Sequence, residues 1–112
     1  MKLSDYVAEF LSEHVDHIFV GNGGCVITQL DSISRNNNIK EIPCQNEQGA
    51  SIAAEAYARI HDFGAALATS GPGMANLFQG ICCVFRFCDC LAPGYFPVLR
   101  VRRLYLQLSL IW

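Results

Sequence analysis

The sequence predicts an α/β fold in which a parallel sheet has helices on both faces. Short apolar runs of four or five residues alternate with longer segments of helical spacing. The short runs are almost entirely apolar, as expected of strands that are covered on both sides. The expected elements, in chain order, are helix 3–14, strand 17–20, helix 26–34, strand 39–43, helix 47–60, strand 65–69 and helix 74–83.

Amphipathic spacing predicts the first helix, 3–14. Its apolar residues share one stripe, which comprises Leu3, Val7, Phe10 and Leu11. The apolar run 17–20 predicts the first strand, which ends in the glycine-rich segment 21–24. Helical spacing over 26–34 predicts the second helix, and a run of asparagines stops it because Asn tolerates the left-handed conformation.

The alternation of strand and helix continues in the second half of this region. The run 39–43 predicts the second strand, and Asn46 is a suitable N-cap for the alanine-rich helix 47–60. Small side chains allow that helix to approach a neighbour closely. The run 65–69 predicts the third strand, which breaks at the Ser-Gly-Pro-Gly segment 70–73 before helical spacing resumes.

Composition excludes several classes of protein. The 112 residues are 52% apolar and 16% charged, which predicts one globular domain rather than a disordered chain. The net charge of −2 excludes a strongly basic nucleic-acid binder. No apolar run reaches the roughly 20 residues that a membrane span needs. The N-terminal segment carries acidic residues and lacks the apolar core of a signal peptide, so we expect a cytoplasmic protein with mostly free thiols.

Charge and cysteine content change near residue 84. Residues 1–83 contain nine acidic and four basic residues, whereas residues 84–112 contain one acidic and four basic residues. Four of the six cysteines cluster at this change without a recognised zinc spacing, namely Cys82, Cys83, Cys88 and Cys90. We therefore expect a domain at 1–83 and a divergent hydrophobic and basic tail at 84–112. An altered reading frame or a retained intron would produce such a junction.

The tail also contains a strand-like pattern. Leucines alternate with other residues from position 104 to position 110, which is typical of a strand. Because the tail does not continue the alternation of apolar strands and helices, we expect the sheet to lack its later strands and to have an open edge.

Three strand-to-helix turns are the candidate functional region. In an open parallel sheet, ligands bind beyond the carboxyl ends of the strands, and the segments 21–24, 43–47 and 70–73 all follow strands. Taken alone, each segment has an ordinary explanation. Segment 21–24 can be a tight turn, the acid in segment 43–47 can complement the helix dipole from the first turn, and segment 70–73 can be a helix start. They become informative because the topology places them at one edge. The three histidines pair with no nucleophile and are expected to be structural or surface residues.

Two linked motifs carry a resemblance to a known family. The segment 46–50 (Asn-Glu-Gln-Gly-Ala), followed by 54–59 (Ala-Glu-Ala-Tyr-Ala-Arg), resembles thiamine-diphosphate-dependent enzymes of the acetolactate synthase type. The segment 68–77 (Ala-Thr-Ser-Gly-Pro-Gly-Met-Ala-Asn-Leu) resembles the same family at the matching distance downstream. Together, residues 1 to about 83 resemble the N-terminal pyrimidine-binding domain of these enzymes.

The resemblance implies a cofactor, thiamine diphosphate, and a role for one carboxylate. In the family, the glutamate that matches Glu47 hydrogen-bonds N1′ of the aminopyrimidine ring and activates the cofactor, which acts as an electron sink for 2-oxo acids. A carboxylate suits this role because it can share and exchange a proton. Glu47 is therefore the implied catalytic residue. The implied cofactor-binding residues are Gly21, Asn22, Gly23, Gly24, Glu47, Ser70, Gly71, Pro72, Gly73 and Asn76.

The other half of the cofactor site is expected outside this chain. The family holds diphosphate and magnesium through a Gly-Asp-Gly motif, and the 112 residues contain no such motif. The resemblance therefore implies no metal ligand here and a second subunit, either a homodimer partner or a separate diphosphate-binding chain. Three interpretations stay open: a truncated family member that is inactive alone, a stand-alone subunit of a split decarboxylase, and a non-catalytic α/β interaction module. The resemblance indicates no substrate and leaves a requirement for FAD open.

Overall fold

The computed structural model describes residues 1–89 and 103–108, and within them the side chains of residues 1–80 and Cys82. The elements, in chain order, are α1 (Leu3–Ser12), β1 (His17–Val20), the 3₁₀ turn η1 (Gly24–Val26), α2 (Ile27–Ser34), β2 (Lys40–Pro43), α3 (Glu47–His61), β3 (Phe63–Ala68), α4 (Pro72–Asp89) and β4 (Arg103–Leu108).

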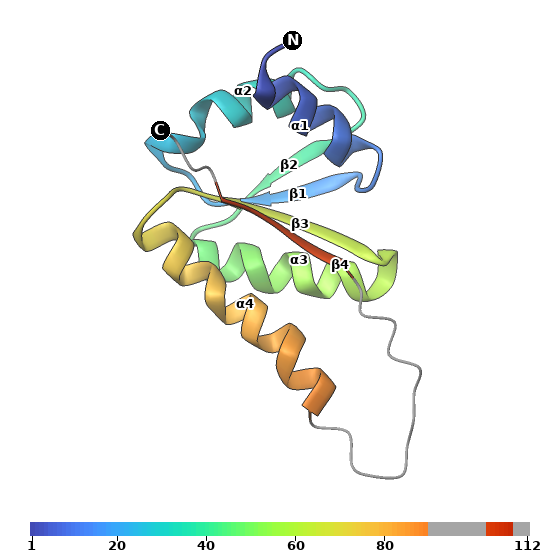
Figure 1. Ribbon diagram of the computed structural model, residues 1–112, viewed down its shortest axis with the longest axis vertical. Helices are drawn as coiled ribbons and strands as arrows, with labels where there is room; N and C mark the ends of the chain where they lie inside the picture. Colours follow the sequence, from blue (N-terminus) through green and yellow to red (C-terminus); the bar gives the residue numbers. More distant parts are fainter. Residues whose placement is uncertain (90–102, 109–112) are drawn as a thin grey trace.

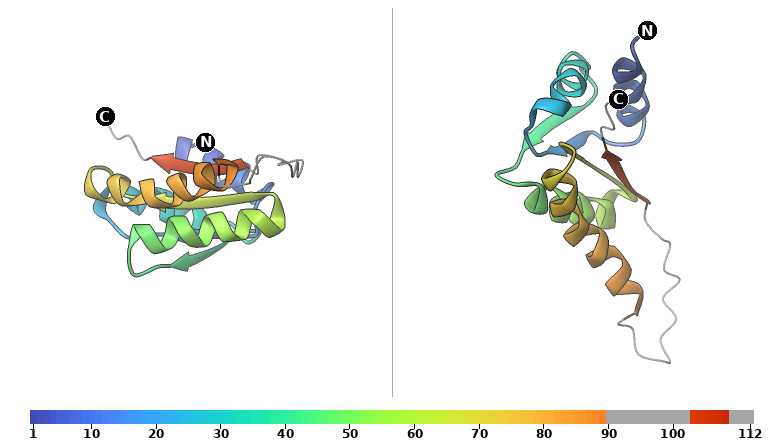
Figure 2. Two further views of the ribbon diagram at one scale, coloured as in Figure 1. Left: turned by 90° about the horizontal axis from the view of Figure 1, so that it is seen from below. Right: turned by 60° about the vertical axis from the view of Figure 1, so that its left-hand side comes forward.

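A parallel sheet forms the middle layer, with the strand order β2-β1-β3-β4 (Figure 1). His17 of β1 lies opposite Lys40 of β2, and Phe19 lies opposite Ala66 of β3. Helices α1 and α2 cover one face of the sheet, and α3 and α4 lie on the other (Figures 1 and 2). The predicted fold class, an α/β parallel sheet with helices on both faces, is confirmed.

Strand β3 supplies the core on both faces of the sheet. All six of its residues are buried, and successive side chains point to opposite faces. Ala65 and Leu67 belong to the core beneath α1 and α2, whereas Ala66 and Ala68 pack with Leu77 of α4 on the other face. This two-sided burial explains why the strand is apolar throughout rather than alternating.

Small residues allow α3 to lie close to β3 and α4. A Cβ atom placed on Gly64 of β3 would overlap the carbonyl oxygen of Ala54. On the other side of α3, the backbone N–H of Gly80 in α4 donates to the Ser51 hydroxyl at 3.2 Å. Ser51 and Ala54 are both fully buried. Much of the small-residue face of α3 is therefore used inside the chain.

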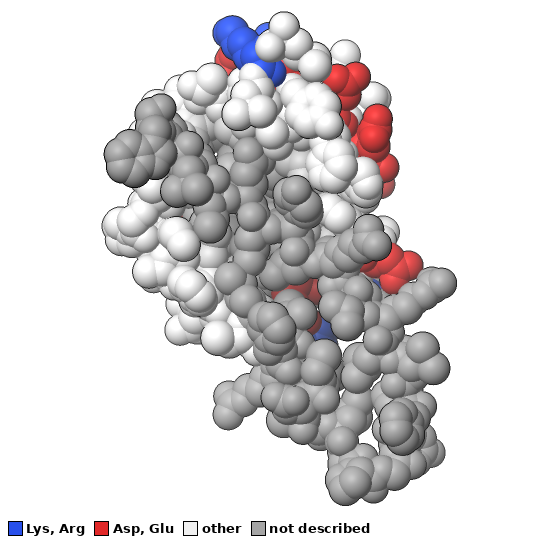
Figure 3. All heavy atoms as spheres, in the orientation of Figure 1, with Lys and Arg blue, Asp and Glu red and all other residues white. Residues whose placement is uncertain are grey.

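A polar network joins α1 to α2. The Ser32 hydroxyl donates to the Asp5 carboxylate at 2.8 Å, and the Arg35 guanidinium lies 3.1 Å from the same oxygen. The hydrogen bond from Ser32 is the main cause that lowers the pKa of Asp5, and a backbone hydrogen bond and the charge of Arg35 act in the same direction. Acidic side chains also gather along the margin beside α1 in Figure 3.

Three elements differ from the expected bounds by two residues or more at one end or both. The first helix ends at Ser12 rather than at residue 14, and β3 spans Phe63–Ala68 rather than residues 65–69. Helix α4 begins at Pro72, so Pro72 and Gly73 lie in its first turn instead of in a preceding loop. Proline is favoured there because the first helical N–H has no partner within the helix.

Two described segments beyond residue 83, residues 84–89 and 103–108, have regular secondary structure. Helix α4 runs without interruption to Asp89, so the change in composition is not the end of this helix. The strand-like pattern of the tail is confirmed by β4, which pairs with β3 from Phe63–Arg103 to Ala68–Leu108. Strand β4, rather than β3, is therefore an edge strand of the described sheet. That a domain ends between residues 83 and 84 stays a prediction.

Candidate functional site

Glu47 lies at the carboxyl edge of the sheet, in the first turn of α3. Strand β2 ends at Pro43, and the chain reaches α3 through Asn46, whose backbone is extended. The Asn46 side-chain oxygen accepts a hydrogen bond from the Gly49 N–H at 2.7 Å, as the N-cap prediction requires. This cap fixes where the helix begins and so fixes the backbone of Glu47.

The side chain of Glu47 fits between two glycines from the other two turns. A Cβ atom on Gly21, after β1, would lie 2.6 Å from Cγ of Glu47. A Cβ atom on Gly73, at the start of α4, would lie 3.1 Å from its Oε1. The half-buried carboxylate thus occupies space that only the bare backbone of glycine leaves open. The structure therefore brings the three predicted turns together around Glu47.

The two carboxylate oxygens of Glu47 have different surroundings. The Asn76 side-chain amide on α4 donates to Oε2 at 3.3 Å, slightly longer than the usual range of about 2.7–3.2 Å for such a bond. Within the described part of the chain, Oε1 accepts no hydrogen bond and lies over the backbone of Gly73. One oxygen accepts a hydrogen bond from a side chain, and the other has no donor among the described residues.

A second set of contacts joins the first and third turns. A Cβ atom on Gly23 would lie 2.7 Å from the Thr69 hydroxyl, so these two segments approach closely. The Ser70 hydroxyl donates to the Cys25 sulfur at 3.4 Å. Hydrogen bonds from Ser70 and then Thr69 lower the pKa of the Cys25 thiol, because they stabilise the thiolate. Sequence reasoning missed Cys25 and Thr69, although each is immediately adjacent to a segment it had singled out.

Other predicted site residues stand further from the carboxylate. Gly24 and Gly71 are exposed, and a Cβ atom on either would meet nothing within 4 Å. Gly71 has a φ of +71°, so its role in the turn before α4 is conformational. Asn22 and Pro72 are exposed at the rim, and Asn22 lines a neighbouring groove between α2 and β2.

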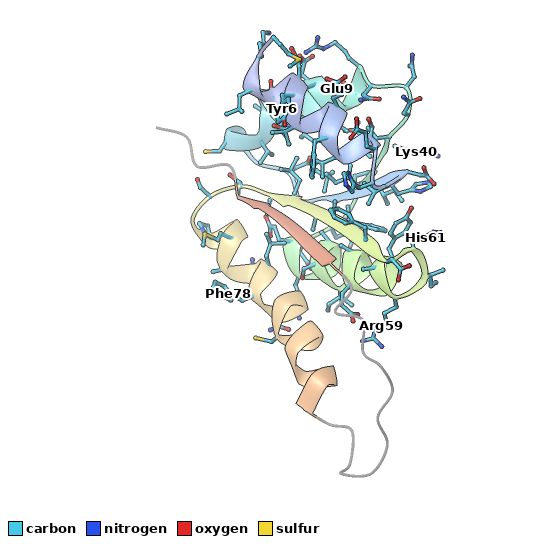
Figure 4. The ribbon with its side chains drawn as sticks, turned by 45° about the vertical axis from the view of Figure 1, so that its right-hand side comes forward. Tyr6, Glu9, Lys40, Arg59, His61 and Phe78 are labelled. Carbon is cyan, nitrogen blue, oxygen red and sulfur yellow. The ribbon has the colours of Figure 1, made fainter. Side chains whose placement is uncertain are left out.

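The histidines lie among aromatic rings at the opposite end of the sheet. His17 begins β1 and faces Tyr57 with ring centroids 6.0 Å apart, and His61 stacks on the same tyrosine at 4.2 Å. Figure 4 shows His61 and Arg59 at the C-terminal end of α3, whereas Glu47 begins that helix. The histidines therefore take no part in the arrangement around Glu47.

The described residues contain neither a grouping of three side chains suited to bind a metal ion nor a helix able to cross a membrane. Cys25, Cys44 and Cys82 are free thiols in that part of the chain. The chemistry that the described residues offer at this edge of the sheet is thus carboxylate, amide, hydroxyl and thiol chemistry.

Residues 1–86 match the family described as "Thiamine pyrophosphate enzyme, N-terminal TPP binding domain". The chain belongs to this family of thiamine pyrophosphate (thiamine diphosphate) enzymes, as its motifs predicted.

Three relatives illustrate the similarity. The chain is 39% identical over 82 residues to "Acetolactate synthase 2, chloroplastic" of Nicotiana tabacum, covering 71% of this chain and 12% of the relative. It is 41% identical over 80 residues to the "2-hydroxyacyl-CoA lyase" of Saccharomyces cerevisiae, covering 70% and 14%. It is 37% identical over 79 residues to the "Pyruvate decarboxylase" of Neurospora crassa, again covering 70% and 14%. The match thus spans 12–14% of the length of these relatives.

Proposed function

We propose that this chain supplies the aminopyrimidine half of a thiamine diphosphate site, with Glu47 as its proton-exchanging group. The observation that carries the proposal is the position of the Glu47 carboxylate in the gap between Gly21 and Gly73. A carboxylate at the carboxyl edge of a parallel sheet stands where ligands of such folds bind. Membership of the family identifies the cofactor class.

The residues around Glu47 fit an aminopyrimidine ring. Gly21 and Gly73 have no side chains, which leaves room for the Glu47 side chain at the carboxyl edge of the sheet, where a flat ring can meet its carboxylate. Oε1 of Glu47 can share a proton with a ring nitrogen, because no described residue donates to it. When bound, thiamine diphosphate supplies an electron sink for making and breaking bonds beside a carbonyl carbon. The task of Glu47 is to hold and move the proton at the ring nitrogen.

The names of the relatives support a wider proposal about the reaction. They include acetolactate synthases and a pyruvate decarboxylase, so we propose a 2-oxo acid as the substrate class of the complete enzyme. Diphosphate and magnesium are then held by a diphosphate-binding domain that is not part of these 112 residues.

We further propose that a second subunit docks on the outer surface of α3 and α4. Ile52 of α3 is 42% exposed and Phe78 of α4 is 52% exposed, and Figure 4 shows Phe78 directed away from the sheet. Ala50 and Ala54 are unavailable for this contact because both are fully buried within the chain. Exposed apolar side chains on two helices that pack together are the support for this contact.

The substitution Glu47→Gln tests the proposal. Residues 1–86 would replace the matching segment of the tobacco acetolactate synthase, and the exchange of the thiamine diphosphate C2 proton would be followed by NMR. Glutamine keeps the shape of the side chain but cannot exchange a proton, so we expect a loss of about 10²-fold or more. Glu9→Gln, on an exposed position of α1 (Figure 4), is the matched control and should leave the exchange rate unchanged.

Two results would overturn the proposal. One is an exchange rate in the Glu47→Gln hybrid that equals the rate of the unsubstituted hybrid. The other is a correctly folded hybrid that binds no thiamine diphosphate, which would favour a non-catalytic interaction module.

A further inference from the structure

We infer that Asn76 is a positioning residue for the Glu47 carboxylate. It holds Oε2 by a hydrogen bond, and this leaves Oε1 to interact with the ligand. This inference rests on the proposed function of Glu47. Its starting observation is the hydrogen bond from the Asn76 amide to Oε2, on an oxygen that is distinct from the one beside Gly73.

The backbone of Asn76 is fixed by the contact between α3 and α4. One helical turn further along, the Gln48 amide donates to the Gln79 side-chain oxygen. The Gly80 N–H donates to the buried Ser51 hydroxyl beside that pair. These bonds set the distance between the two helices at the place where Asn76 faces Glu47. The Asn76 amide therefore reaches the carboxylate from a rigid support.

The exposure of Asn76 indicates that this hydrogen bond contributes little to stability. Both Asn76 and its hydrogen bond to Glu47 are exposed to solvent. A solvent-exposed hydrogen bond largely replaces bonds to water and adds little to the free energy of unfolding. The hydrogen bond has a larger effect on the orientation of the carboxylate. An N–H donor aligned on one oxygen restricts rotation about the last bond of the Glu47 side chain. The long distance of 3.3 Å agrees with a bond that shortens when the ligand binds.

The substitution Asn76→Ala tests this role, with Gln79→Ala as the matched control. Both remove a side-chain amide that links α4 to α3, but only Asn76 contacts Glu47. In the hybrid enzyme, we expect Asn76→Ala to slow C2 proton exchange by about tenfold, as for the loss of one hydrogen bond to a charged group. The dissociation constant for thiamine diphosphate should stay within about twofold, and Gln79→Ala should change neither quantity.

The substitution Asn76→Asp supplies a pH profile that a merely structural role would not produce. At neutral pH the new carboxylate cannot donate to Glu47 and repels it, so exchange should be at least as slow as in Asn76→Ala. As the pH falls, a proton on the new aspartate restores a donor. The ratio of the Asn76→Asp rate to the Asn76→Ala rate should therefore rise toward acid pH.

The hydrogen bond itself can be observed in the full 112-residue chain without any cofactor. Glu47→Gln should shift the Asn76 side-chain amide signals in ¹⁵N–¹H spectra and leave those of Gln79 in place. Shifts of equal size at both amides would overturn the inference, because they would report a general movement of α4.

The results separate the inference from the function on which it rests. If Glu47→Gln slows exchange but Asn76→Ala does not, the inference is overturned and the proposed function stands. If Asn76→Ala and Gln79→Ala reduce the rate of C2 proton exchange, the affinity for thiamine diphosphate and the thermal stability to the same extent, Asn76 is a structural residue. The inference then fails as well. If Glu47→Gln has no effect, the proposed function itself fails.

Discussion

The substitution Gly64→Ala should destabilise the protein by forcing α3 away from the sheet. The added Cβ would overlap the Ala54 carbonyl oxygen and lie 3.0 Å from the Ala58 Cβ. The obstructing atom is backbone, so no side-chain rotation relieves the overlap. Helix α3 would have to retreat by about 1.3 Å to restore an ordinary contact of 3.4 Å, in a core that is packed as densely as a crystal.

The expected cost follows from this geometry. Overpacking costs about 1–3 kcal/mol, and a rigid backbone obstruction places Gly64→Ala near about 3 kcal/mol. At about 4–8 °C per kcal/mol for a domain of this size, the thermal midpoint should fall by roughly 12–24 °C. Circular dichroism of the full chain during heating, together with urea unfolding, measures both quantities.

Two further variants make the test specific. Gly24→Ala is the matched control, because its Cβ would meet nothing within 4 Å, and its stability should stay within about 0.5 kcal/mol of the parent chain. Adding Ala58→Gly to Gly64→Ala removes the smaller contact but leaves the Ala54 carbonyl and places a glycine inside α3, which costs about 1 kcal/mol, so the stability should not recover. The reasoning is refuted if Gly64→Ala melts within about 3 °C of the Gly24→Ala control.

Two other predictions concern acid stability and self-association. The folded-state pKa of Asp5 lies below its unfolded value, so its contribution is present above about pH 4 and is lost as the pH falls. Urea midpoints between about pH 5 and pH 2 should therefore fall less steeply in Asp5→Asn than in the parent, and equal slopes would contradict this assignment. If a second copy docks on α3 and α4, sedimentation at roughly tens of micromolar should show a dimer that Phe78→Asp dissociates. A monomer in the parent chain would exclude self-association at that concentration.

Local chemistry made the order of elements and the position of Glu47 predictable. The apolar run 17–20 became β1 with the expected bounds, and Asn46 caps α3 as its side chain predicted. These features depend on residues within about one helical turn of each other, which a sequence displays directly. The carboxyl-edge rule then placed the three turns together, because parallel strands end at the same side of a sheet.

Boundaries were less predictable where packing overrides local signals. The sequence indicated a change of composition near residue 84, yet α4 continues to Asp89. A change in charge or cysteine content does not stop a helix, because neither removes a backbone hydrogen bond. Strand β4 was visible as an alternating pattern, but its pairing with β3 depends on a distant segment of chain.

Spacing, caps and motifs are local properties, so the fold class, the family and the candidate glutamate could be read from the sequence. The contacts of Glu47 with Gly21, Gly73 and Asn76, and the contact of Ser70 with Cys25, became visible in the folded chain. Asn76 and Glu47 are 29 positions apart, and Cys25 and Ser70 are 45 positions apart. Contacts at such separations depend on how closely α3 and α4 pack on the sheet, and that distance is set by Gly64, Ser51 and Gly80 together rather than by any one local pattern.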